Sequence, residues 1–219
     1  PYLTASLFGL HTPIVSGAMN GTETDLTWAS SDVANFQVYA LRDKFLSKDV
    51  RFMLTASDGG LPFLASGLTS SYYQNVYDNS KWNFAVRLKP HGYPQSFASG
   101  ALDSYNDYIV EFYGVNYIAD RKVNEFSVSA SVSKTAAENF LTSPKRLFVG
   151  AHHTNFTGTV LHRTDTKITS VRYWKDYLEN SAIQNHALDP GNFGHPRPNR
   201  NTYLLETDLE NIEVPEIES

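Results

Sequence analysis

The chain contains no cysteine among its 219 residues. Disulfide bonds and thiolate metal ligands are therefore excluded. Because extracellular animal domains often carry disulfides, this absence disfavours a secreted animal protein and fits a product assembled in a reducing compartment. The familiar nucleophile and phosphate-binding patterns are missing as well, since there is no Gly-x-Ser-x-Gly, no Walker sequence and no Gly-x-Gly-x-x-Gly. We therefore expect a protein that is not an enzyme.

Charge is also scarce, at 19% of the residues, and it sums to a net charge of −5. Nonspecific binding to nucleic acid or to an anionic membrane surface requires basic patches, and the basic residues here form only small clusters. No apolar run approaches the ~20 residues that a membrane-spanning helix needs. We expect neither a nucleic-acid partner nor membrane insertion. A start at Pro1 indicates a processed chain or a fragment of a longer one.

Aromatic residues are plentiful, with 13 Tyr, 13 Phe and 3 Trp, and they favour strands. Apolar and polar residues alternate in several short segments, as in strands with one buried face. The clearest runs are residues 82–88 and 126–132, and the second has serines on its polar side. Similar patterns predict strands over residues 3–7, 34–40, 50–56 and 108–115. Residues 135–141 have room for one helical turn before the next proline.

The segment 145–194 predicts three further strands and a short helix. Residues 145–151 form a compact apolar run, 159–162 resume an extended pattern after a turn, and 168–174 are rich in β-branched and aromatic residues. Residues 178–187 then carry apolar side chains at helical spacing, and Asn180 is placed to cap the first turn.

The order of these elements resembles the end of laminin G-like, concanavalin A-like jelly-roll domains. In such domains a strand with the pattern F-x-G precedes a strand of the type I-x-x-V-R-Y-W and a turn of the type L-x-x-x-x-I. The matching residues here are Phe156, Gly158, Ile168, Val171, Arg172, Tyr173, Trp174, Leu178 and Ile183. Residues 108–115 and 124–128 are similar to paired strands of laminin G-like modules in large bacteriophage structural proteins. The resemblance implies that Trp174 and Phe156 point into the core.

We therefore expect an all-β fold, a two-sheet antiparallel jelly-roll sandwich of the concanavalin A-like kind with one short helix near the C-terminus. Residues 1–205 are expected to form this domain, and residues 206–219 an acidic linker or extended tail. The resemblance implies a non-catalytic structural module of a bacteriophage virion, in the capsid, neck or tail, within a larger oligomeric assembly. The alternative is a lectin-like carbohydrate-binding module, extracellular or at a cell surface.

A third hypothesis rests on the triplet Glu206, Asp208 and Glu210, whose spacing places three carboxylates on one face of a strand. Laminarinase-like glycosidases of the same fold use such a triplet, and retaining chemistry needs two carboxyl groups about 5 Å apart. In those enzymes several strands follow the triplet, whereas this chain has room for none. We therefore interpret these residues as a solvated acidic tail.

The metal hypotheses are weak. His152 and His153 are neighbours that point to opposite faces of a strand, and His162 could approach one of them if the two strands pair. No carboxylate stands at a spacing that completes a zinc site. Asp165 and Asp58 are conceivable Ca²⁺ ligands, because some laminin G-like domains bind Ca²⁺. Aspartate is equally an ordinary turn residue, so we expect no cofactor, with Ca²⁺ as the open alternative.

Glycan binding would need aromatic rings on the surface. Tyr73 and Tyr93 are the candidates for stacking on a sugar, the first with Tyr72, Tyr77 and Trp82 close in sequence. Aromatic residues in this fold are more often part of the core. The sequence leaves both interpretations open.

Overall fold

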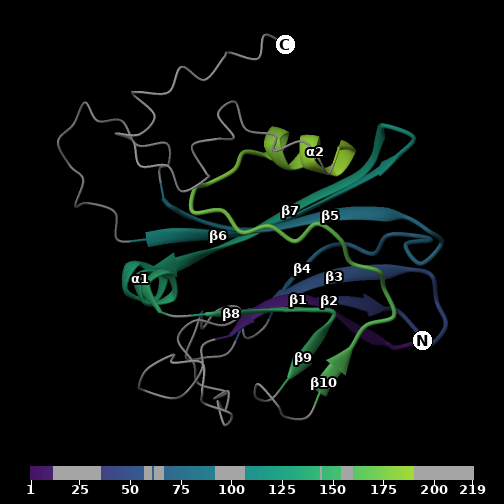
Figure 1. Cartoon of the computed structure of the whole chain (residues 1–219), viewed down its shortest axis with the longest axis horizontal. Helices are drawn as coiled ribbons and strands as arrows, with labels where there is room; N and C mark the ends of the chain where they lie inside the picture. Colours follow the sequence, from purple (N-terminus) through teal and green to yellow (C-terminus); the bar gives the residue numbers. More distant parts are fainter. Residues whose placement is uncertain are drawn as a thin grey trace.

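The computed structural model describes residues 1–11, 36–56, 61, 67–91, 107–143, 145–153 and 160–189. These residues form a mostly β structure with two main antiparallel sheets, a two-stranded sheet and two helices (Figure 1). No helix among them is long and apolar enough to span a membrane. The predicted all-β class is therefore confirmed at the level of two antiparallel sheets.

The first sheet has the order β4-β3-β2-β1-β8. Its strands are Thr4–His11 (β1), Phe36–Arg42 (β2), Val50–Thr55 (β3), Leu68–Thr69 (β4) and Arg146–Val149 (β8). Strands β1 to β4 follow one another across the sheet, and β8 returns from late in the chain to pair antiparallel with β1. The alternation that predicted β3 is visible in its burial, because Val50, Phe52 and Leu54 are buried and the residues between them are not.

The second sheet has the order β5-β6-β7. Its strands are Lys81–Pro90 (β5), Asp107–Ile118 (β6) and Arg121–Ser133 (β7). A two-residue turn joins β6 to β7, and both of its central residues, Ala119 and Asp120, have positive φ angles of 46° and 62°. Positive φ at both positions is the signature of a type I′ turn, which matches the twist of the flanking strands. The predicted serine face of β7 is confirmed, since its serines are exposed.

The two sheets pack face to face around one hydrophobic core. Phe52 of β3 lies at the contact, with ring centroids 4.8 Å from Trp82, 4.6 Å from Phe84 and 5.9 Å from Phe126 of the opposite sheet. Buried side chains of β1, β2, β3, β6 and β7 belong to the same cluster. This shared core makes the two sheets one unit.

Two helices flank the second sheet, where the sequence predicted one. Helix α1 (Lys134–Thr142) continues directly from β7, and the Ser133 side chain accepts a hydrogen bond from the Ala136 amide at its start. It extends beyond the single predicted turn because Ala137 and Phe140 are buried in the core. Helix α2 (Asn180–Leu188) was predicted correctly, but its N-cap is Glu179, so the capping role assigned to Asn180 is wrong.

Helix α2 packs on the outer face of the second sheet. Its Ala182 and Ile183 join Leu178 in a second hydrophobic cluster with Tyr113 and Val115 of β6. The middle strand of the second sheet is therefore buried on both faces: one face meets the core and the other meets α2.

The predicted strand over residues 145–151 is divided in the structure. Gly150 has a φ of 73°, a left-handed conformation that ends β8 and starts β9 (Ala151–His153) in a new direction. Strand β9 pairs antiparallel with β10 (Val160–Arg163) to make the two-stranded sheet. The pairing that would bring His162 near this histidine pair is present, with His162 opposite His152.

The predicted strand over residues 168–174 is wrong. We name residues 164–179 the crossing segment, because they run from β10 past the side of the two sheets to α2 without joining either (Figure 1). Ser170 has a φ of 55°, which interrupts an extended conformation. β-branched and aromatic residues favour a strand where a neighbouring strand pairs with them, and no strand in the described part of the chain pairs with residues 168–174.

Candidate functional site

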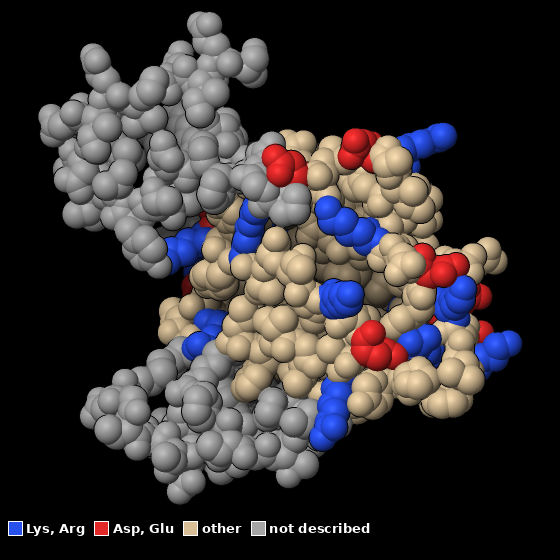
Figure 2. Space-filling view, turned by 45° about the vertical axis from the view of Figure 1, so that its right-hand side comes forward, with Lys and Arg blue, Asp and Glu red and all other residues tan. Residues whose placement is uncertain are grey.

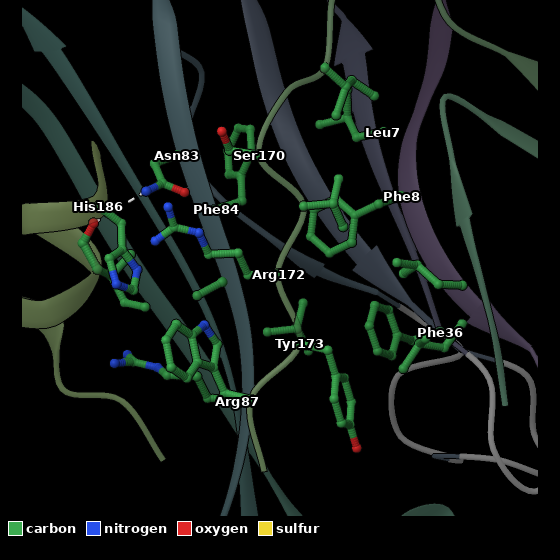
Figure 3. A pocket seen from close by; sticks show the side chains of 18 of the residues that line it. Leu7, Phe8, Phe36, Asn83, Phe84, Arg87, Ser170, Arg172, Tyr173 and His186 are labelled. Carbon is green, nitrogen blue, oxygen red and sulfur yellow. Dashed lines mark hydrogen bonds between the residues drawn. The ribbon is translucent and has the colours of Figure 1, made fainter. Parts of the chain in front are cut away.

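A cavity of about 860 Å³ lies beneath the crossing segment, along the β5 edge of the second sheet, and it is lined both from the space between the sheets and from the outer face beside α2. Its floor combines apolar side chains of both sheets, among them Leu7, Phe8 and Phe36 of the first sheet and Phe84 of the second. Figure 3 shows Leu7, Phe8 and Phe36 on one side of the crossing segment, and Asn83 of β5 and His186 of α2 on the other. The volume falls within the range typical of small-molecule sites.

A β-bulge in β1 shapes the floor. The pairing of β1 with β2 shifts between Ser6 and Phe8, so Leu7 is an additional residue in its strand. A bulge changes which face of the sheet the following side chains occupy. As a result Leu7 and Phe8, neighbours in sequence, both line the cavity. Simple alternation would have placed them on opposite faces.

The charged residues around the cavity are strongly biased in sign. Among the described residues that line it, six are basic and one is acidic: Lys81, Arg87, Lys145, Lys167, Arg172 and Lys175, against Asp176. Figure 2 shows a hollow on one face of the molecule with lysine and arginine side chains on its border. Because the whole chain has a net charge of −5, this bias is a local property of the cavity.

Arg87 is fixed by neighbours on the outer face of the second sheet. Its guanidinium lies 3.1 Å from the Glu111 carboxylate and donates a hydrogen bond of 2.8 Å to the Leu178 carbonyl. Glu111 also pairs with Lys89 at 3.0 Å and accepts from the Tyr177 hydroxyl at 2.7 Å. Burial raises the pKa of Glu111, but hydrogen bonds from Tyr177 and Lys89 and the charge of Arg87 outweigh it, so the pKa lies below its usual value.

This network attaches the end of the crossing segment to β5 and β6, since Tyr177 and Leu178 are its last residues before the helix cap. Trp174, predicted to be a core residue, is half-buried here and packs against the second cluster. Its ring stacks on His186 of α2 with centroids 5.6 Å apart. The other predicted core residue, Phe156, lies outside the described residues.

Lys145 lines the cavity near α1. Its ammonium donates hydrogen bonds to the Leu141 and Ser143 carbonyls at 3.2 and 2.6 Å and lies 5.0 Å from the Phe140 ring centroid. Burial lowers the pKa of the Lys145 amine. No ion pair within the described residues involves Lys145, Lys81, Lys167 or Lys175.

Asp165, the candidate Ca²⁺ ligand, is engaged by protein groups. Its carboxylate accepts from Arg42 at 2.8 Å, from the Tyr77 hydroxyl at 2.8 Å and from the Tyr2 amide at 3.2 Å. The Arg42 guanidinium also lies 3.3 Å from the centroid of the Tyr77 ring. Asp58 lies outside the described residues, and within them no group of three potential metal ligands occurs. Asp165 therefore has a structural partner for its charge.

Of the two candidates for sugar stacking, only Tyr73 lies within the described part of the chain, and Tyr93 lies outside it. The Tyr73 ring packs on core rings, with centroids 4.9 Å from Trp82 and 6.0 Å from Phe126, and its hydroxyl donates to the Glu125 carbonyl at 3.2 Å. Its neighbour Tyr72 is the more exposed of the pair. Stacking on a glycan stays a prediction for both candidates.

The carboxylate triplet Glu206, Asp208 and Glu210 also lies outside the described residues. The cavity is the feature that the sequence did not predict, because its walls come from strands far apart in the chain. One sequence signal could have pointed to it: the crossing segment carries Lys167, Arg172 and Lys175 in a chain that is acidic overall. Comparison with family models, with curated proteins and with solved structures finds no match in any of the three.

Proposed function

We propose that this chain is a non-catalytic assembly module, a jelly-roll sandwich within a larger structural protein of the bacteriophage virion type. Two findings are consistent with the jelly-roll part: the two antiparallel sheets share one core, and β8 returns to the first sheet beside the N-terminal strand. The virion setting is supported by the similarity of residues 108–115 and 124–128 to paired strands of laminin G-like modules in phage structural proteins.

The observation that carries the assembly role is a pair of exposed apolar side chains in the loop between β2 and β3. Phe45 and Leu46 at its tip are 60% and 67% exposed. Leu46 has a φ of 66°, a conformation that residues other than glycine rarely adopt. Such strain costs on the order of 1 kcal/mol or more and persists where the surroundings enforce it, commonly at functional positions.

The surroundings of this loop are ordered by hydrogen bonds. Arg42 donates to the Ser47 carbonyl, and the Asp49 amide donates to the Ser47 hydroxyl at 3.0 Å. The Arg42 amide also binds the carbonyl of Leu3, which is 52% exposed, so the first residues of the chain lie beside the loop. An ordered loop that holds large apolar side chains in water is what a protein partner would cover.

The test measures self-association of the chain by sedimentation equilibrium. We expect concentration-dependent association that is lost in the double variant Phe45→Ser/Leu46→Gly. Glycine at position 46 also removes the strain, so this variant should be monomeric without loss of stability. Ile118→Ser at the β6–β7 hairpin is the matched control for an exposed apolar residue and should associate like the parent.

A parent chain that stays monomeric across the whole concentration range would contradict assembly of identical copies through this loop. Equal association of the parent and the double variant would place the contact elsewhere. An interface found by cross-linking should bury more than ~1,000 Å², as specific interfaces do.

A further inference from the structure

Strand β7 forms an open edge of the second sheet. It runs from the β6–β7 hairpin to α1 (Figure 1) and pairs with β6, and within the described residues no strand pairs with its other side. Its serines are exposed, while Val128 and Ala130, which face the core, are only half-buried. The free side of β7 is therefore accessible at the surface.

One hydrogen bond shows which backbone groups lie on this free side. The Glu125 carbonyl accepts from the Tyr73 hydroxyl at 3.2 Å, so it points away from β6. Backbone groups of successive residues point to opposite sides of a strand. The amides and carbonyls of Ser127, Ser129 and Ser131 therefore point away from β6 as well, and those of the residues between them bond to it. In the described part of the chain, no strand pairs with these outward groups.

The other sheet edges have features that protect an edge from further pairing. Strand β4 has only two residues and β8 only four. Strand β5 ends at Pro90, carries Lys81, Arg87 and Lys89, and has the crossing segment beside it. By contrast, β7 is 13 residues long, and residues 126–133 contain no charge, no proline and no bulge. Short strands, charges and proline are the usual protection of an edge, and a strand without them is a template for a further strand.

The sequence of this edge indicates its partner. Residues 127–133 read Ser-Val-Ser-Ala-Ser-Val-Ser, which is the same in both directions from Ala130. A two-fold axis presents the same surface of both copies to each other, and it pairs two copies of one edge strand antiparallel. With the axis at Ala130, Ser129 lies opposite Ser131 of the partner subunit. Every serine then faces a serine, every valine a valine, and Ala130 its own counterpart.

We propose that β7 pairs antiparallel with β7 of a second copy of this chain, about a two-fold axis at Ala130. This pairing joins the second sheets of two copies into one continuous sheet. Serine opposite serine on the outer face forms cross-strand hydrogen bonds. On the core face, the second copy covers Val128 and Ala130, which are half-buried in the single chain. The start of α1 at Lys134 ends the pairing at Ser133.

The pairing is a weak contact between free copies. Seven residues on each strand bury less than the ~1,000 Å² of a specific interface, so sedimentation at micromolar concentration would not detect it. In an assembly, other contacts raise the effective concentration of one β7 edge beside the next, and the same pairing becomes favourable. The role of this contact rests on the proposed assembly function, whereas the pairing itself does not require the Phe45 loop.

A cysteine at the two-fold axis captures the pairing. Because the chain has no cysteine, Ala130→Cys introduces a single thiol that faces its counterpart. The outward groups belong to the serines, so Ala130 forms a non-hydrogen-bonded pair, in which Cα atoms lie about 4.5 Å apart, a separation that a disulfide spans. The test uses the Phe45→Ser/Leu46→Gly chain, which lacks the loop contact. We expect a disulfide-linked dimer on a non-reducing gel after incubation with oxidised glutathione.

Ser127→Cys in the same chain is the matched control. Ser127 is exposed and Ala130 half-buried, so the control thiol is the more accessible of the two. In the proposed register, however, the two Ser127 positions lie six residues apart along the paired strands, or about 20 Å. We therefore expect Ala130→Cys to cross-link at least tenfold faster than Ser127→Cys.

Two changes at Ser129 test whether the cross-link needs strand pairing. Ser129→Pro removes an outward amide and no hydrogen bond to β6, so it should leave the fold intact and slow cross-linking of Ala130→Cys about tenfold. Ser129→Lys keeps the amide but brings two like charges close together across the axis, and it should slow cross-linking as well. Far-UV circular dichroism checks the fold of each variant. If Ser129→Pro fails to fold, Ser129→Lys decides the outcome.

Three results would overturn the proposal. No dimer from Ala130→Cys would show that β7 does not meet a second copy, and equal rates for Ala130→Cys and Ser127→Cys would refute the register. Cross-linking that neither change at Ser129 slows would refute strand pairing. The loop contact is judged separately: a parent chain that stays monomeric in sedimentation, together with rapid cross-linking of Ala130→Cys, would refute the Phe45 loop alone.

Discussion

Replacement of Phe52 by alanine tests whether the two sheets depend on one shared core. Phe52 is 2% exposed, and four aromatic rings lie around it: Tyr73, Trp82, Phe84 and Phe126. Loss of a buried phenylalanine costs about 3–5 kcal/mol, which combines the lost transfer free energy with the cavity left behind. We expect at least the middle of that range, about 4 kcal/mol, because each ring pair adds about 0.5–1.5 kcal/mol beyond burial.

The free energy of unfolding is measured by guanidinium titration, with far-UV circular dichroism as the signal. For a chain of this size, 4 kcal/mol corresponds to a fall in Tm of about 8–16 °C. Tyr72→Ala is the matched control, since Tyr72 is 49% exposed and should change the stability by no more than about 0.5 kcal/mol. A loss below about 1 kcal/mol for Phe52→Ala, with an unchanged m-value, would refute the arrangement of the sheets described above.

Two further predictions concern β6 and the crossing segment. Gly114→Ala should destabilise the protein by about 1–3 kcal/mol, measured by the same titration, because the new Cβ would lie 2.3 Å from a Phe126 ring atom; an increase in stability would refute this packing. Asp165→Asn should cost about 2 kcal/mol at neutral pH, since Arg42 loses its charged partner. Burial raises the pKa of Asp165, but the hydrogen bonds from Tyr77 and Arg42 lower it by more. The pKa of Asp165 in the folded protein is therefore below its value in the unfolded chain. The ionised Asp165 therefore stabilises the folded protein above about pH 4, and this stabilisation is lost as the pH falls through the pKa of the folded protein. A difference in unfolding free energy between the parent and Asp165→Asn that does not change with pH would contradict this.

Strands with one clearly buried face could be predicted from the sequence. The alternation over residues 82–88 and 126–132 predicts β5 and β7, because successive residues of each strand face the core and the outer side of the sheet in turn. Helix α2 was predictable for the same reason, since one face of it meets the second sheet. In these elements the local pattern and the tertiary environment agree.

The crossing segment shows where such reasoning fails. Residues 168–174 have the composition of a strand, yet strand formation depends on a partner, and the conformation of Ser170 prevents a continuous extended run. The sequence does not show whether a partner strand is present. For α1 the prediction was too short, because burial of Ala137 and Phe140 extends the helix beyond the single turn that the sequence indicated.

The cavity could not be predicted for a related reason. Leu7 and Phe8 reach it together only because of the bulge in β1, and Phe84 and Arg172 approach it from distant parts of the chain. The candidate residues chosen from the sequence lie in other surroundings. Asp165 forms an ion pair with Arg42, and the ring of Tyr73 packs against the core. Composition identified the fold class, whereas the site depends on how the elements come together.

The return of β8 to β1 has a consequence for how the chain folds. The β6–β7 hairpin joins neighbouring residues through a two-residue turn and can form on a microsecond timescale. By contrast, β8 pairs with β1 from far along the chain, with Phe8 opposite Val149. Closing so large a loop is costly in entropy, and we expect it to be the last step. Until it occurs, β1 presents an open edge, and association between unfinished chains will compete with folding at high concentration.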